Sequence, residues 1–318
     1  MTPMYPHPVP PPALTHQALI YSSEAEFLAA AVPFCQDGVA HGDALMVLAG
    51  AATTALLRPA LAGIGPVDFI AAERWYDTPG GALGAAHRYV DECVTEHGRV
   101  GIRVLGEPVW QGRDTVETAE WTRYESALNL ALAGSPAWLL CAYDARLLPA
   151  PVVAGARRSH PQLREGTAAR FSSDYVEPTD PQGAWNHRLA PLPAAGESTL
   201  DFRSDLSPVR AFVAATARAF GASPDEVERL VFSVNELATN ALQHGGEGRL
   251  TMHLDGRRVV CDVTNPGPHS TDWFLGYRPP LPDQERGYGL WTVRQLCHLV
   301  QIDTHDGRTT FRLYLNLG

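Results

Sequence analysis

The chain has 318 residues, of which 45% are hydrophobic and 19% are charged, so it can bury the cores of two ordinary domains. Its formal net charge of −10 argues against nonspecific DNA or RNA binding, which needs basic patches, and favours a partner with a basic surface. All 25 basic residues are arginine, which excludes a lysine Schiff base and the lysine of a Walker A motif.

The cysteines and the N-terminal residues indicate the cellular compartment in which the protein is expected to act. The five cysteines form no Cys-x-x-Cys pair, no secretory signal begins the chain, and no apolar run reaches the ~18 residues of a membrane span. We therefore expect a reduced, cytoplasmic protein with no membrane partner and no direct nucleic-acid partner. Residues 1–15 contain six prolines and predict a flexible tail.

The first predicted domain, residues 16–178, alternates short apolar runs with helical patterns. This order predicts a mainly parallel sheet with helices on both faces and ligands at the carboxyl ends of its strands. The turn at residues 49–54 lies where a P-loop would, but it lacks the lysine and the glycine spacing, so we assign no nucleotide there. The predicted strands are residues 18–21, 44–48, 67–71, 100–105 and 137–142, and the predicted helices are residues 23–38, 53–62, 79–96 and 115–133.

A second proline-rich stretch, residues 177–197, predicts a linker, because proline is excluded from helix interiors and central strands. We place the linker at residues 179–199 and a second domain at residues 200–318. In that domain Ser207-Pro208 begins one helix. A capping box at residues 223–226 begins a longer helix, which Gly245-Gly246 ends.

The rest of the second domain is predicted as two hairpins around one more helix. Two-residue Asp-Gly turns at residues 255–256 and 306–307 indicate the hairpins. Helix, helix, hairpin, loop, helix and hairpin in this order predict an α/β sandwich with a mostly antiparallel sheet. The predicted strands are residues 249–254, 258–264, 299–304 and 309–315, the irregular segment is 265–286, and the last helix is 289–297.

Three motifs in the second domain carry residue types that suit phosphate chemistry. Glu236 and Asn240 share one face of the long helix, where a carboxylate can accept a proton and an amide oxygen can bind Mg²⁺. Residues 264–268 (Thr-Asn-Pro-Gly-Pro) end a strand, and residues 286–290 (Arg-Gly-Tyr-Gly-Leu) lead into a helix whose backbone N–H groups suit a phosphate. Because a Glu-x-x-x-Asn pair alone is a common solvated helix face, the assignment depends on the ordered combination.

In this order the motifs resemble the N, G1 and G2 boxes of the GHKL ATPase superfamily, and residues 307–310 (Gly-Arg-Thr-Thr) resemble its last hairpin. The resemblance covers residues 200–318 and implies the Bergerat α/β sandwich of that superfamily. Residues 236–241 (Glu-Leu-Ala-Thr-Asn-Ala) and 289–296 (Gly-Leu-Trp-Thr-Val-Arg-Gln-Leu) are most similar to the small bacterial anti-sigma-factor/serine-kinase group.

The resemblance implies ATP and Mg²⁺ as cofactors and gives the motif residues their roles. It implies that Glu236 is the general base toward a partner serine hydroxyl and that Asn240 holds Mg²⁺. Asn265 and Gly267 are implied to face adenine. The other residues implied to bind ATP are Arg286, Gly287, Gly289, Leu290 and Thr310.

The G1 motif departs from the family pattern Asp-x-Gly-x-Gly, because Asn265 replaces the aspartate and His269 replaces the second glycine. The amide oxygen of Asn265 can still accept a hydrogen bond. Losing a charge-assisted hydrogen bond worth ~1.5–3 kcal/mol would weaken ATP binding roughly ten- to hundredfold. The departure favours, as the alternative function, a noncatalytic partner-binding module with a degenerate nucleotide site.

A histidine kinase shares the ATPase fold but needs a phospho-accepting histidine on a dimeric helical hairpin directly upstream. Here a proline-rich linker and an α/β domain occupy that position. His160 and His187 lie in proline-flanked stretches without helical periodicity, so we reject this interpretation.

The first domain contains four characteristic blocks, at residues 16–21, 33–35, 101–108 and 137–141. These blocks resemble the MEDS sensory domain, which has a RecA/KaiC-like sheet, and the resemblance covers residues 16–178. It implies a small-molecule ligand, and the polar or reactive residues in these blocks are His16, Cys35, Glu107 and Cys141. A buried small hydrophobe is the alternative for each cysteine, and no ligand spacing in the sequence supports a metal or haem site.

Together the two resemblances imply a bacterial anti-sigma regulatory factor. They imply an ATP-binding serine/threonine kinase that acts on a STAS-type anti-sigma-factor antagonist, binds a sigma factor, or does both, under the control of the sensory domain. A homodimer is compatible with this interpretation.

Overall fold

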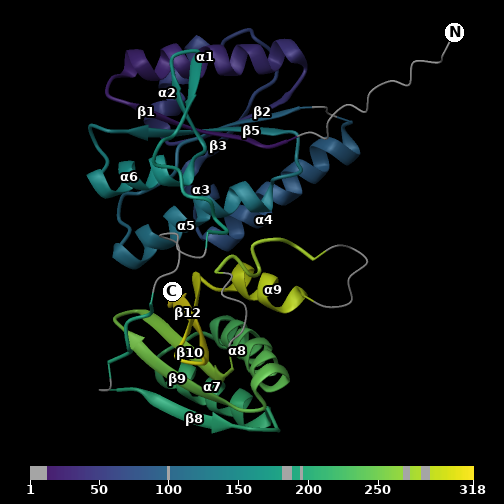
Figure 1. Cartoon of the computed structure of the whole chain (residues 1–318), viewed down its shortest axis with the longest axis vertical. Coiled ribbons are helices and arrows are strands. Elements are labelled where there is room, and N and C mark those ends of the chain that lie inside the picture. Colours follow the sequence, from purple (N-terminus) through teal and green to yellow (C-terminus); the bar gives the residue numbers. More distant parts are fainter. Residues whose placement is uncertain (1–12, 99–100, 181–187, 194–195, 268–272, 281–286) are drawn as a thin grey trace, which may run out of the picture. The chain divides into compact units, whose positions relative to one another are not determined.

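The computed structural model describes residues 13–98, 101–180, 188–193, 196–267, 273–280 and 287–318, and the chain forms two compact units (Figure 1). One unit is built on a seven-stranded sheet and the other on a five-stranded sheet. Within the described ranges, no helix is both long and apolar enough to cross a membrane. The expected α/β fold with two sheets is confirmed.

The seven-stranded sheet has the order β3-β2-β4-β5-β1-β6-β7. Its neighbouring strands are all parallel except β6 and β7, which pair as an antiparallel hairpin. The central strands are almost entirely buried, as expected for a sheet covered on both faces. The strands are β1 (Thr15–Tyr21), β2 (Ala44–Ala49), β3 (Asp68–Ala71), β4 (Ile102–Gly106), β5 (Ala137–Asp144), β6 (Gln162–Glu165) and β7 (Ala168–Phe171).

The helices of this half begin and end at recognisable signals. Ser23 caps α1 by accepting the Glu26 N–H at 3.2 Å, and Gly42 ends the helix in the left-handed region with φ of 79°. Helix α1 covers one face of the sheet (Figure 1). Its side chains Phe27 and Phe34 are buried in the core on that face. The helices are α1 (Glu24–His41), α2 (Ala51–Ala60), α3 (Ala72–Trp75), α4 (Pro79–Asp91) with the π-helical segment Glu92–Glu96, α5 (Thr115–Ala131) and α6 (Ala150–Ser159).

Helix α6 and the β6–β7 hairpin are absent from the sequence-based prediction. Strands β6 and β7 have four residues each, and every residue of β7 is exposed, so no apolar run marks them. The apolar residues of α6 are mostly alanine, with Val152 and Val153 as the larger ones, so its helical periodicity is weak.

The five-stranded sheet has the order β11-β12-β10-β9-β8, and all neighbouring strands are antiparallel. Helices α7 and α8 cover one face of it (Figure 1). The elements are β8 (Ser198–Phe202), α7 (Ser207–Ala219), α8 (Pro224–Gly245), β9 (Gly248–Asp255), β10 (Arg258–Pro266), α9 (Tyr288–Leu296), β11 (Leu299–His305) and β12 (Arg308–Asn316).

Strand β8 was missed by the sequence analysis and begins at Ser198, inside the segment expected as linker. It is an edge strand whose residues alternate between half-buried and exposed until Phe202, so it has too few apolar residues to stand out. Phe202 packs against Gly248, where a Cβ would lie 2.4 Å from its ring. The five-residue strand therefore closes the sheet at its β9 edge.

Helix α8 positions the candidate site, and its N-terminus is strongly fixed. Ser223 and Glu226 form the predicted capping box, and Glu226 Oε1 also accepts the N–H of Gly318 at 2.7 Å. These backbone hydrogen bonds hold the pKa of the Glu226 carboxyl below its usual range. The buried face of α8, which includes Leu230, Val234 and Leu237, belongs to a core whose members all lie between Phe202 and Leu315.

Candidate nucleotide site

Glu236 and Asn240 project from the C-terminal half of α8 on the same helical face. Both are half-buried, while their neighbours Leu237, Ala238 and Ala241 are fully buried against the sheet. The alternation of buried and half-buried positions fixes the rotation of the helix. The carboxylate and the amide are therefore held at the edge of the core and reach solvent.

The end of α8 meets the end of β10 at a close backbone approach. A Cβ added to Gly245 would lie 2.6 Å from the carbonyl oxygen of Pro266 and 2.9 Å from Asn265 Nδ2. Asn265 is 1% exposed, and its Nδ2 donates to the Pro266 carbonyl oxygen at 2.9 Å. Glycine at position 245 thus allows the first two sequence motifs to touch.

Gly267 links this corner to the β11–β12 turn. Its φ of 101° is one that side-chain-bearing residues rarely adopt, and its N–H donates to the Gly307 carbonyl oxygen at 2.8 Å. The hydroxyl of Thr309 donates to the Gly267 carbonyl oxygen at 3.3 Å. Thr310 pairs instead with Thr264 across the sheet, with hydroxyl oxygens 2.9 Å apart.

The third motif begins α9. Gly287 is the N-cap with φ of 104°, and Gly289 lies in the first turn. A Cβ added to Gly289 would lie 2.6 Å from Glu236 Oε2, so the first turn of α9 rests against the Glu236 carboxylate. Leu290 packs beside Gly276, where a Cβ would lie 2.8 Å from Leu290 Cγ.

The structure therefore places the described motif residues around one end of α8. Glu236 lies beside Gly289, and Asn265 and Gly267 lie beside the helix end, with Asn240 between these two points on α8. Arg286 and His269 lie outside the described residues. A carboxylate next to a helix N-terminus combines a proton acceptor with backbone N–H groups that suit a phosphate.

The candidate sensory residues of the first half do not form one group. Glu107 caps α2: its carboxylate accepts the Gly50 N–H and the Thr53 hydroxyl, each at 2.9 Å. These groups lie in the turn where a P-loop would hold phosphate, so the chain's own carboxylate takes the anion position at this helix N-terminus. This geometry agrees with the absence of a P-loop motif in the sequence.

Cys35 lies in the apolar core between α1 and the seven-stranded sheet and is 0% exposed. Burial raises the pKa of its thiol to about 12, so it stays protonated and acts as a small hydrophobe. This geometry is the alternative that the sequence analysis gave for each cysteine.

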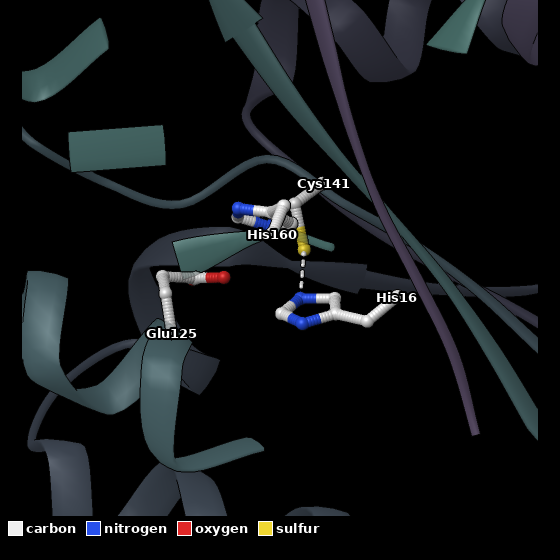
Figure 2. Close-up of side chains that lie close together, drawn as sticks. All are labelled: His16, Glu125, Cys141 and His160. Atoms are coloured by element: carbon white, nitrogen blue, oxygen red, sulfur yellow. Dashed lines mark hydrogen bonds between the residues drawn. The ribbon is translucent and has the colours of Figure 1, made fainter. Parts of the chain in front are cut away.

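His16 and Cys141 do come together, with Cys141 Sγ 3.5 Å from His16 Nε2. Two residues that the sequence analysis did not select as sensory residues, Glu125 and His160, lie beside them (Figure 2). No sequence spacing marks this group, because its members are spread over more than 140 residues. Glu125 has no local signal of its own, because Glu120, Arg123 and Ser126 make the surrounding part of α5 polar as well.

Comparisons with known proteins agree with this division. A family model of the MEDS (methanogen/methylotroph, DcmR sensory) domain matches residues 15–161, and one of a histidine kinase-like ATPase domain matches residues 201–315. No curated protein matches the chain. Among solved structures, the RsbU and RsbW domains of a Mycobacterium tuberculosis protein match with 20% identity and a TM-score of 0.28, covering 38% of this chain and 32% of that chain. This chain thus spans about a third of that structure's length.

Proposed function

We propose that this chain, which joins a MEDS sensory domain to a histidine kinase-like ATPase domain, is a bacterial anti-sigma regulatory factor. In this proposal the ATPase domain binds ATP with Mg²⁺ and phosphorylates a serine or threonine of a STAS-type anti-sigma-factor antagonist, or binds a sigma factor. The observation that carries it is the contact between Glu236 and Gly289, which places a carboxylate at the N-terminus of α9.

The described residues fit a nucleotide with a divalent cation. Residues 267, 287 and 289 are glycines, so they add no side chain that would cover the backbone near Glu236 and the end of β10. Asn240 offers an amide oxygen, a ligand type that Mg²⁺ accepts, on the same helical face as Glu236. When bound, ATP supplies the phosphoryl group, and Mg²⁺ neutralises the negative charge of the phosphates.

Glu236 is the residue we assign to proton transfer. A partner's serine hydroxyl needs a proton acceptor as it attacks, and a positioned carboxylate contributes ~10²–10⁴-fold to such a step. The packing of Leu237 and Ala238 fixes α8 under Glu236, and the first turn of α9 limits where its carboxylate can move. Asn240 would then hold the Mg²⁺ that accompanies the phosphates, and the α9 backbone N–H groups would bind phosphate oxygens.

The alternative is a noncatalytic module that holds its partner through the same fold. Asn265 favours it, because this residue is buried, carries no charge, and uses its amide N–H on Pro266. The two functions differ in one outcome: both predict a partner, and only the kinase predicts a phosphorylated product.

The charge and the domain order favour a regulator with a basic partner. The net charge of −10 suits a sigma factor, which carries DNA-binding surfaces, and electrostatic complementarity speeds such encounters. In this proposal the protein acts in the cytoplasm, and a small molecule bound in the MEDS domain changes how the ATPase domain meets its partner. A homodimer is compatible with this scheme.

The experiment that tests the proposal is a phosphotransfer assay with the full-length chain, labelled ATP, Mg²⁺ and candidate STAS-type antagonists. We expect phosphoserine or phosphothreonine on one antagonist. Glu236→Gln should reduce the rate by ~10²–10⁴-fold without loss of nucleotide binding, because only the proton acceptor is removed.

Glu228→Gln is the matched control, since Glu228 is exposed on the same helix and should leave the rate unchanged. Equal rates for Glu236→Gln and the parent protein would remove Glu236 from the mechanism. An absence of phosphorylated product with every antagonist that binds would favour the noncatalytic alternative.

A further inference from the structure

Four buried side chains with metal-binding atoms converge in the MEDS half of the chain: His16, Glu125, Cys141 and His160 (Figure 2). Their side chains are buried, with exposed fractions of 2%, 1%, 5% and 0% in that order. One ligand atom from each lies within 4.8 Å of every other. Two imidazoles, a thiol and a carboxylate form a typical donor set for a transition metal.

The sheet topology brings these residues together. Strands β1 and β5 are parallel neighbours in which Ala18 pairs with Cys141, so His16, two residues earlier, projects from the same face. Leu19 and Tyr21 face the opposite core, against α1. His160 directly follows α6, and Glu125 lies on α5, so the group joins two central strands to two helical segments.

Hydrogen bonds fix the tautomer of His16. Its Nδ1 lies 3.0 Å from Asn129 Oδ1, and the Asn129 amide is oriented because its Nδ2 donates to the Ser159 carbonyl oxygen at 2.8 Å. Since an amide oxygen only accepts, Nδ1 carries the proton, and the lone pair of neutral His16 is on Nε2. That Nε2 is the atom that faces Cys141 Sγ.

The same arrangement holds His160. Its Nδ1 lies 2.8 Å from the Ala156 carbonyl oxygen, so this nitrogen is the donor and Nε2 carries the lone pair. Metal-binding histidines are usually held in this way, with the second nitrogen donating to an oxygen that orients the ring. Both histidines therefore have the outer hydrogen bonds of metal ligands.

The distances suit a tetrahedral ion. With bonds of ~2.0–2.1 Å to nitrogen and ~2.3 Å to sulfur, tetrahedral geometry puts a nitrogen and a sulfur ligand ~3.6 Å apart. Cys141 Sγ and His16 Nε2 are 3.5 Å apart. Glu125 lies one helical turn before Asn129 on α5, so the residue that orients His16 and the carboxylate ligand share one helix.

We propose that His16, Cys141, His160 and Glu125 bind one Zn²⁺-class transition-metal ion in the MEDS domain. The thiol of Cys141 gives its proton to solvent and binds as thiolate. Four protein ligands fill a tetrahedral shell, so the site is structural or sensory and is not hydrolytic, because catalytic zinc keeps a position for water. The thiolate and imidazoles select against Mg²⁺ and Ca²⁺, which take oxygen ligands.

The experiment uses the full-length chain and Co²⁺ as a spectroscopic probe. We expect one Co²⁺ per chain, tetrahedral visible bands and a thiolate-to-cobalt charge-transfer band, with Zn²⁺ displacing the Co²⁺. Cys141→Ser should abolish the charge-transfer band. Cys35→Ser, which changes another buried cysteine in the same half of the chain, should keep the band.

Asn129→Ala separates a positioning role from a ligand role. It should lower Co²⁺ affinity by roughly 10- to 100-fold but preserve the charge-transfer band, because the outer hydrogen bond is lost while the four ligands remain. If Cys141→Ser does not fold, X-ray absorption of the unmodified chain with Zn²⁺ decides: one sulfur with nitrogen and oxygen neighbours supports the site.

Several results would overturn the proposal. The absence of stoichiometric Co²⁺ binding would show that the four residues form only a buried hydrogen-bonded group. A charge-transfer band that survives in Cys141→Ser, or a zinc environment without sulfur, would place the metal elsewhere.

Discussion

The two halves of the chain build their candidate sites in different ways. In the ATPase half, the described residues come from motifs in chain order, on α8, at the end of β10 and at the start of α9. In the MEDS half, His16, Glu125 and Cys141 come from β1, α5 and β5, His160 follows α6, and the four meet only when the chain folds. Short contiguous motifs leave a signature in the sequence, whereas a group assembled by topology does not.

The two helix N-termini show the same contrast in a smaller form. The N-terminus of α2 is capped by Glu107, which bonds to Gly50 and Thr53. The N-terminus of α9 begins with glycines, and the nearby Glu236 approaches it from another helix. We therefore expect a structural role for Glu107 and a functional one for Glu236, and two substitutions test this difference.

Gly289→Ala should have the larger effect. Its new Cβ would lie 2.6 Å from Glu236 Oε2, so the carboxylate must move while the helix can stay. Because a displacement of about 1 Å near a reacting group can cost ~10²-fold, we expect the phosphotransfer rate to fall roughly 10- to 100-fold with the fold retained. The rate and the circular dichroism spectrum are the two measurements.

Gly134→Ala is the control for that substitution, because a Cβ added at Gly134 would meet no described atom within 4 Å. It should leave the rate unchanged. A Gly289→Ala protein with the parent rate would show that the contact between α8 and α9 does not position Glu236.

Glu107→Ala should have the smaller effect and act on stability. It removes a cap that accepts two hydrogen bonds at the N-terminus of α2, which is worth ~1–2 kcal/mol. We expect the free energy of unfolding of the MEDS half to fall by about that amount in urea, with ATP affinity unchanged. Glu96→Ala, at an exposed position, should change neither quantity. If Glu107→Ala is as stable as the parent, its carboxylate is not a structural cap.

Sequence patterns predicted most of the fold because apolar runs and turn signals marked its main elements. The capping box of α8 and the Asp-Gly hairpins place the second domain's elements within a few residues of their observed bounds. The exceptions lack a clear apolar pattern: β7 has no buried residue, β8 is a half-exposed edge strand, and α6 has few large apolar residues. Such segments are stabilised by their neighbours, and their own composition does not indicate them.

The candidate site residues also differ in how well the sequence predicts them. Glu236 and Asn240 could be selected in the sequence because their spacing follows the helix period. Cys35 and Cys141 could not be distinguished in the sequence, since burial among apolar side chains and burial beside two histidines look alike there. Only the pairing of β1 with β5 separates them.

The most direct test of the account is calorimetry of ATP binding to the full-length chain with and without Mg²⁺, repeated with Asn240→Ala. We expect binding in the parent protein that strengthens with Mg²⁺, and a variant that keeps the Mg²⁺-independent part but loses the gain, because the amide oxygen that holds the cation is gone. An absence of nucleotide binding at millimolar ATP in the parent protein, or the same gain from Mg²⁺ in the variant, would contradict the assignment of this site.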